Sequence, residues 1–119
     1  LYKICELIKD VIFQSCDFDE SISKVNKGDI MYLDPPYAPE NSKSFVGYTT
    51  DGFNIEMHNK LFKKIIEKEK SGVAFILSNS KVDMVINYFK DYKTEDVVAR
   101  RAINSKNPES KTTEVIIHN

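Results

Sequence analysis

Residues 29–37 read Asp-Ile-Met-Tyr-Leu-Asp-Pro-Pro-Tyr, an apolar run that ends in an acid, two prolines and an aromatic residue. The run 29–33 suits a β-strand. Proline has no N–H to donate to a neighbouring strand, so the strand cannot continue past Asp34. The sequence therefore predicts a strand followed by a stiff corner, with Asp34 and Tyr37 beyond the carboxyl end of the strand.

The segments after this corner alternate between helix and strand. A polar loop is expected over 38–53. Residues 55–71 form the clearest predicted helix, since their apolar residues fall on one stripe, and Gly72 is a suitable end for it. Residues 73–77 (Val-Ala-Phe-Ile-Leu) are continuously apolar, as is typical of a strand covered on both faces. A second helix is expected to open at Ser80.

The two ends of the chain complete the predicted topology. Residues 11–16 are expected to form a buried strand and 18–25 a helix, while 93–101 and 113–118 are expected to pair as an antiparallel hairpin. This order predicts an α/β fold with a three-layer, Rossmann-like sheet of mostly parallel strands that ends in the hairpin. Ligands of such sheets bind beyond the carboxyl ends of the strands, where Asp34 is expected to lie.

Composition excludes several classes of protein. The chain has 119 residues, is 41% hydrophobic and carries a formal net charge of -1, so we expect a folded domain rather than a strongly basic nucleic-acid module. Its two cysteines and two histidines lack metal-ligand spacing, so no metal is expected. No apolar run approaches the roughly 20 residues of a membrane span. The cysteines read as reduced core thiols, and we expect a cytoplasmic protein that does not contact membranes.

The corner has the groups needed for methyl transfer to an exocyclic amine. Asp34 and the carbonyl of Pro35 can accept hydrogen bonds from the two amine hydrogens and so draw the nitrogen lone pair out of the ring. Pro35 and Pro36 have a fixed φ, which keeps that carbonyl aimed. Tyr37 offers a flat face for a base turned out of a duplex. A sulfonium methyl donor has an excellent leaving group, so such an enzyme needs alignment more than a strong base.

The tetrapeptide 34–37 after an apolar strand resembles the catalytic motif of amino-methyltransferases. The chain is more specifically similar to the Dam-type adenine-N6 DNA methyltransferases of the alpha group, because further stretches match that family in the same order. These stretches are 13–18 (Phe-Gln-Ser-Cys-Asp-Phe), 45–48 (Phe-Val-Gly-Tyr), 72–80 (Gly-Val-Ala-Phe-Ile-Leu-Ser-Asn-Ser), 100–103 (Arg-Arg-Ala-Ile) and 114–119 (Glu-Val-Ile-Ile-His-Asn). Ala102 stands where the family has Ser. The resemblance covers about residues 13–119.

This resemblance implies a function and a set of site residues. It implies methyl transfer from S-adenosylmethionine to the N6 amine of adenine in a specific double-stranded DNA sequence. Asp34, Pro35, Pro36 and Tyr37 would form the catalytic motif. The implied cofactor-binding residues are Asp17, Phe18 and Asp34. The implied DNA contacts are Tyr37, Phe45, Tyr48, Arg100 and Arg101.

The family's glycine-rich cofactor loop, the acidic residue for the cofactor ribose and the DNA-recognition segment would lie upstream of this sequence. We therefore expect residues 1–119 to be the C-terminal catalytic portion of a class I methyltransferase domain. Its partners would be double-stranded DNA and the missing N-terminal half, and exposed apolar surface could also drive self-association. Alone, the fragment is expected to bind cofactor weakly and to be inactive. Two other functions stay open: a non-catalytic remnant, and an amino-methyltransferase acting on RNA or protein.

The same residues also have ordinary structural explanations. Asp34 and Asp17 can cap the segments that follow them, and Tyr37 and Phe18 can be core residues. Phe45 and Tyr48 can simply pin their loop to the body of the protein, and Ser78-Asn79 can shape a turn. Arg100 and Arg101 can form a solvated strand end.

Overall fold

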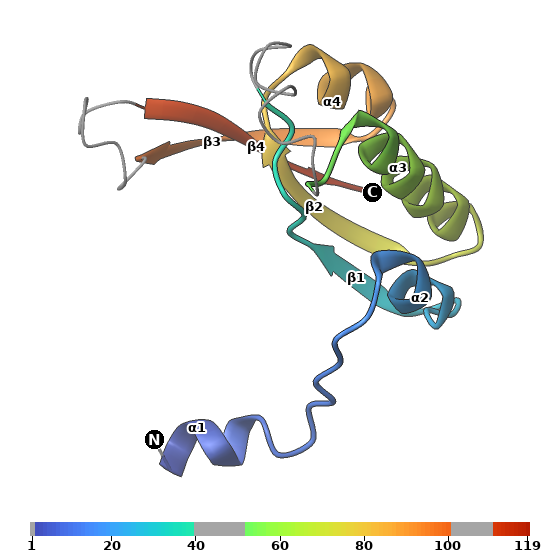
Figure 1. Ribbon diagram of the computed structural model, residues 1–119, viewed down its shortest axis with the longest axis vertical. Helices are drawn as coiled ribbons and strands as arrows, with labels where there is room; N and C mark the ends of the chain where they lie inside the picture. The colour runs from blue at the N-terminus through green and yellow to red at the C-terminus, as the bar shows by residue number, and fades with distance from the viewer. Residues whose placement is uncertain (1, 40–51, 101–110) are drawn as a thin grey trace.

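The computed structural model describes residues 2–39, 52–100 and 111–119 (Figure 1). Its elements in chain order are α1 (Tyr2–Leu7), α2 (Phe18–Ser23), β1 (Ile30–Leu33), α3 (Ile55–Lys70), β2 (Ala74–Ser80), α4 (Asp83–Tyr88), β3 (Lys93–Arg100) and β4 (Lys111–His118). The predicted α/β class is therefore confirmed. Within these ranges, no helix has both the length and the apolar character that crossing a lipid bilayer requires.

The four strands form one mixed sheet in the order β1-β2-β4-β3. β1 and β2 are parallel, with Leu33 opposite Leu77, whereas β4 runs antiparallel to both β2 and β3. The predicted hairpin of the last two strands is confirmed. The prediction of a mostly parallel sheet is wrong, because the returning arm of that hairpin enters the sheet beside β2 in the opposite direction.

The core lies on one face of the sheet. Phe75 of β2 packs against Phe89, which follows α4, with ring centroids 6.0 Å apart, and Phe89 lies 5.0 Å from Phe62 of α3. The other face of the sheet exposes Tyr32 and Ile76. The described part of the chain thus makes two layers, with helices on one face, where three layers were expected.

Helix α3 illustrates how local sequence sets an element. The side chain of Asn54 accepts a hydrogen bond of 3.0 Å from the backbone N–H of Met57, which caps the first turn. Phe62 and Ile65 of its apolar stripe are fully buried. Gly72 follows the helix with φ +94°, and a side chain there would meet Lys27 as well as being strained. The predicted helix and its end are confirmed.

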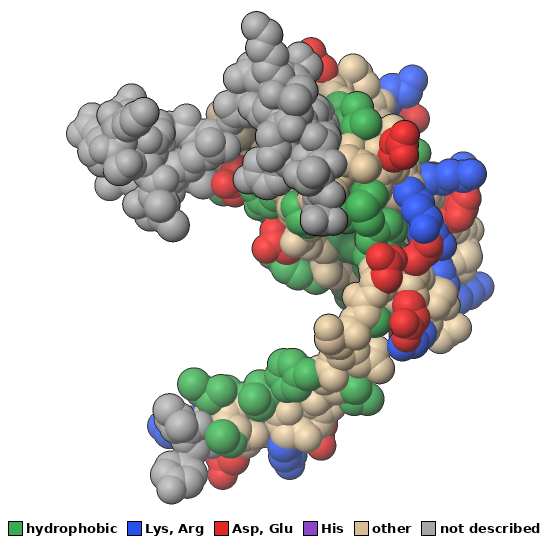
Figure 2. Space-filling view, viewed as in Figure 1, with side chains coloured by type: hydrophobic (Ala, Val, Ile, Leu, Met, Phe, Trp, Pro, Cys, Tyr) green, Lys and Arg blue, Asp and Glu red, His purple; other side chains and the backbone are tan. Residues whose placement is uncertain are grey.

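Two other local predictions are wrong. Residues 11–16 form no strand: they lead away from the sheet toward α1, with Ile12 and Phe13 exposed, because no neighbouring strand in the described structure lies alongside to share hydrogen bonds (Figures 1 and 2). The helix expected at Ser80 begins at Asp83, since Ser80 still pairs with Glu114 in the sheet.

Candidate active site

The corner after β1 lies at the edge of the sheet, as the sequence predicted. Asp34 is exposed and Tyr37 is partly buried. Because β1 and β2 are parallel and in register at Leu33 and Leu77, the residues that follow these two positions meet at the same edge. The carboxylate of Asp34 is thus open to a ligand while its backbone is anchored to the sheet.

Ser78 of β2 orients the Asp34 carboxylate. Its hydroxyl donates a hydrogen bond of 2.7 Å to Oδ1 of Asp34 and lies 3.4 Å from the carbonyl oxygen of Leu33. Ser78 itself is buried. Among the described residues no donor reaches Oδ2 of Asp34, so one carboxylate oxygen is held by the protein and the other is free to accept a new hydrogen bond.

Asn79 anchors the far side of the corner. It is fully buried, and its Oδ1 accepts hydrogen bonds of 2.9 Å from the backbone N–H groups of Ala38 and Ser80. The corner is therefore attached to β2 at both of its ends, through Ser78 and through Asn79. Ser78 and Asn79 lie within β2 and bind the corner, so they do not form a turn of their own, which was the structural alternative for this pair.

The carboxylate of Glu114, on β4, lies near the hydroxyl of Tyr37. The Tyr37 hydroxyl donates to Oε2 of Glu114 over 3.4 Å. Burial, together with the nearby carboxylates of Glu114 and Asp34, raises the pKa of the Tyr37 hydroxyl above its ordinary value. Tyr37 therefore stays neutral around physiological pH, with its hydroxyl oriented by β4.

His58 is a site residue that the sequence analysis missed. It is buried in the first turn of α3, with Nε2 3.0 Å from the carbonyl oxygen of Pro36 and Nδ1 2.9 Å from that of Asn54. The available signal was its spacing, because His58 shares the buried stripe of α3 with Leu61, Phe62 and Ile65. A histidine on such a stripe needs polar partners, and here one of them belongs to the corner.

A cavity of about 410 Å³ opens beside the corner. Its lining residues are Ile12, Gln14, Cys16, Phe18, Ser21, Ile22 and Leu33. Leu33, the last residue of β1, directly precedes Asp34, so the cavity reaches the end of the strand that leads into the corner. Phe18 is thus part of the lining, whereas Asp17 is not, and Oδ1 of Asp17 caps α2 by accepting a 2.8 Å hydrogen bond from the Asp19 N–H. The expectation of core cysteines is wrong, because Cys5 and Cys16 are both exposed.

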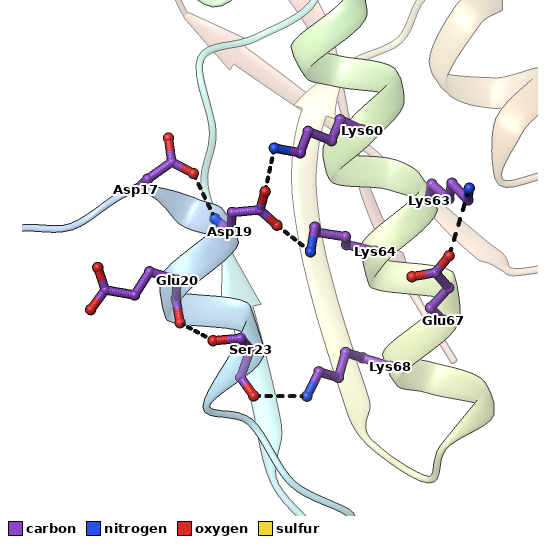
Figure 3. Close-up of polar contacts among 9 residues, drawn as sticks. All are labelled: Asp17, Asp19, Glu20, Ser23, Lys60, Lys63, Lys64, Glu67 and Lys68. Carbon is purple, nitrogen blue, oxygen red and sulfur yellow. Dashed lines mark hydrogen bonds and ion pairs between the residues drawn. The ribbon is translucent and has the colours of Figure 1, made fainter.

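Ion pairs hold α2, and with it Phe18, against α3 (Figure 3). The Asp19 carboxylate lies between Lys60 and Lys64, and the Lys60 ammonium lies 5.7 Å from the centre of the Phe18 ring. Hydrogen bonds from these two lysines lower the pKa of Asp19. Lys68 donates to the Ser23 carbonyl over 3.2 Å. Figure 2 shows acidic and basic side chains interspersed on this side of the molecule. Three of the five lysines of α3, Lys60, Lys64 and Lys68, contact α2.

The remaining predicted site residues cannot be placed from this structure. Phe45, Tyr48 and Arg101 lie outside the described residues, and Arg100 is described only as the last backbone position of β3. The structure therefore brings together the corner 34–37 and the Phe18 cavity, and it adds four anchoring side chains from three other elements: Ser78, Asn79, His58 and Glu114.

The chain belongs to the D12 class N6 adenine-specific DNA methyltransferase family, whose sequence pattern matches residues 1–103. It is 32% identical over 107 residues, 88% of its length, to the type II methyltransferase M1.LlaDCHI of Lactococcus lactis subsp. cremoris. It is 30% identical over 115 residues, 97% of its length, to the retron Ec67 DNA adenine methylase of Escherichia coli. It is 34% identical over 113 residues, 93% of its length, to the type II methyltransferase M.MjaIII of Methanocaldococcus jannaschii.

These matches confirm the predicted membership in the Dam-type adenine methyltransferases. The chain covers 38%, 39% and 39% of the length of the three relatives, respectively. The matches therefore establish the family of this chain, which spans less than half the length of these relatives.

Proposed function

We propose that this chain carries the catalytic motif of a methyltransferase that moves the methyl group of S-adenosylmethionine to the N6 amine of adenine in double-stranded DNA. One observation supports this most directly: the exposed Asp34 carboxylate is held at one oxygen by Ser78 and followed by a rigid diproline, and Leu33 before it lines an open cavity. Family membership supports the same reaction.

The corner would act on the amine through two acceptors. The free Oδ2 of Asp34 accepts one amine hydrogen, and the Pro35 carbonyl accepts the other. Both acceptors are preorganised, the first by Ser78 and the second by the fixed φ of the prolines, so little reorganisation is needed at the moment of transfer. Tyr37 stacks on the adenine turned out of the duplex.

The cavity lined by Leu33 and Phe18 suits the cofactor. Its apolar side chains, Phe18, Ile22 and Leu33, fit the faces of an adenine ring, and the polar Gln14 and Ser21 suit its edge. Asp17 would contribute through Oδ2, since its Oδ1 caps α2. Bound S-adenosylmethionine supplies a methyl group on a sulfonium.

The other partners follow from the same proposal. By residue type, Phe45 and Tyr48 would help enclose the base, and Arg100 and Arg101 would contact phosphates. We further propose that residues 1–119 work as the C-terminal portion of a longer class I methyltransferase domain. The rest of that domain would cover the apolar sheet face that exposes Tyr32 and complete a three-layer, Rossmann-like sheet. A DNA substrate fits a cytoplasmic location.

Substitution of Asp34 in the full-length protein tests this function. Asp34→Ala is expected to lower kcat for methylation of adenine in DNA by about 10²–10³-fold, because one of two preorganised acceptors is lost. Asp83→Asn, which alters an exposed carboxylate on α4, is the matched control and should leave kcat unchanged. The assay follows transfer of a labelled methyl group to duplex DNA, RNA and peptide in parallel. Methylation of RNA or peptide alone, or no methylation by the wild-type protein, would contradict the proposal.

A further inference from the structure

His58 is 1% exposed, although imidazole is polar. Two aromatic side chains enclose it, with Phe53 at 4.7 Å and Phe62 at 5.8 Å between ring centroids, both in edge-to-face geometry. A ring buried in this way needs hydrogen-bond partners, and each of its nitrogens faces a backbone carbonyl oxygen. One of those carbonyls belongs to Pro36, in the middle of the corner.

The two carbonyls differ in what else they bond. The Asn54 oxygen already accepts the backbone N–H of His58 over 3.0 Å, as the first hydrogen bond of α3. For the Pro36 oxygen, the described residues offer no donor other than Nε2 of His58. A proton on Nε2 satisfies the carbonyl that would otherwise lack a donor. That proton is present both in the neutral Nε2–H tautomer and in the doubly protonated ring.

His58 also stands between the two halves of the proposed site. The Phe18 ring, in the cavity lining, lies 5.7 Å from the Phe53 ring, and Phe53 lies against His58. Further along α3, Lys60 and Lys64 hold α2 through Asp19. Phe53, just before α3, and these two lysines therefore contact the cavity side, while His58 contacts the corner.

We propose that His58 is a positioning residue, whose Nε2–H holds the Pro36 carbonyl toward α3 and so leaves the Pro35 carbonyl as the backbone acceptor of the corner. This inference rests on the proposed function and assigns it a residue that touches neither substrate nor cofactor. With Asn79 holding the N–H of Ala38, His58 completes a pair of anchors on either side of Tyr37.

Two amide substitutions in the full-length protein separate this role from simple packing. In His58→Gln the amide nitrogen can occupy the place of Nε2, whereas in His58→Asn it reaches only the place of Nδ1. We expect kcat of His58→Gln to stay within about threefold of wild type. We expect His58→Asn to lose about 10–100-fold in kcat, with KM for DNA and for S-adenosylmethionine within about threefold, because a misaligned acceptor slows transfer without weakening binding.

Equal kcat in the two variants would overturn the proposal, whether both fall or both are retained. If His58→Asn does not fold, the ring-nitrogen signals of the wild-type protein decide, measured by long-range ¹H–¹⁵N correlation after selective histidine labelling. A proton on Nε2 supports the assignment, and a lone pair there overturns it. This measurement does not depend on methyl transfer, so a wild-type protein that is inactive on DNA refutes the proposed function while the nitrogen signals still test His58.

Discussion

Ser78, within β2, and Asp34, just past the end of the parallel strand β1, are joined by a 2.7 Å hydrogen bond. The bond depends on strand register, because Ser78 and Asp34 are the next residues after the paired Leu77 and Leu33. A slip of one residue would turn the Ser78 side chain to the opposite face of the sheet. The orientation of the carboxylate is therefore a property of the sheet rather than of the corner alone.

Ser78→Ala is expected to reduce kcat by about tenfold in the full-length enzyme, since loss of a hydrogen bond to a charged group costs about 1.5–3 kcal/mol and part of that reaches the transition state. Ser80→Ala is the control, because Ser80 is buried in the same strand and its side chain makes no bond to Asp34 among those described. Steady-state kinetics on duplex DNA measures both. Similar losses in the two variants would show that the effect is general loosening of β2.

The ring of Tyr37 is expected to matter more than its hydroxyl. Tyr37→Phe keeps the stacking surface and loses only the 3.4 Å contact with Glu114, so kcat/KM should fall no more than about threefold. Tyr37→Ala removes the stacking, worth about 1–3 kcal/mol per base, and should cost about 5–100-fold. Kinetics with a duplex carrying a mismatched target base supplies the check, since easier extrusion should partly restore Tyr37→Ala. Equal effects of Phe and Ala would contradict a stacking role.

Cys16 provides a direct test of the cavity. It is exposed and lines the cavity, whereas Cys5 is exposed on α1 and is not among the lining residues. Saturating S-adenosylmethionine should slow alkylation of Cys16 by about tenfold or more in the full-length protein and leave Cys5 unchanged. Peptide mass spectrometry after timed iodoacetamide treatment reads both thiols in one sample. Equal protection of the two cysteines, or of neither, would argue against cofactor in this cavity.

Asp19 makes the packing of α2 on α3 sensitive to acid. Hydrogen bonds from Lys60 and Lys64 lower its pKa below the ordinary 3.8, so the ion pairs stabilise the fold above that pH and are lost as pH falls through the lower, folded-state value. Asp19→Asn should therefore lower Tm only slightly at pH 7, by about 2 °C, because the pairs are solvent-accessible.

The difference between wild type and Asp19→Asn should persist at pH 5 and shrink as the pH falls below 3.8, toward the lowered pKa of the folded-state carboxyl. Thermal melts across this range measure it, and high salt should shrink it at pH 7. Glu20→Gln is a suitable control, since the ion partner of Glu20 among the described residues is Lys24 of the same segment. A difference that grows as the pH falls would contradict the assignment.

Elements with a strong local pattern were predictable. The stripe, N-cap and glycine end of α3 are all encoded within its own 19 or so residues, and the diproline stops β1 whatever surrounds it. The predicted strand over 11–16 is wrong because an apolar run forms a strand only beside a partner strand. The hydrophobic pattern of a segment does not show whether such a partner is present. The start of α4 was misplaced for a similar reason, since pairing with Glu114 keeps Ser80 in the sheet.

The stiff corner 34–37, the family and the alternation of helices and strands could all be read from residues close together in the chain, because proline geometry and side-chain periodicity are local. Asp34, Tyr37 and Ala38 are anchored by residues of β2 and β4 that lie 41 to 77 positions further along the chain. Those partners, like the mixed sheet and the bond from His58 to Pro36, depend on strand order, register and helix packing. Such contacts arise only when the whole sheet has assembled, so no short stretch of sequence predicts them.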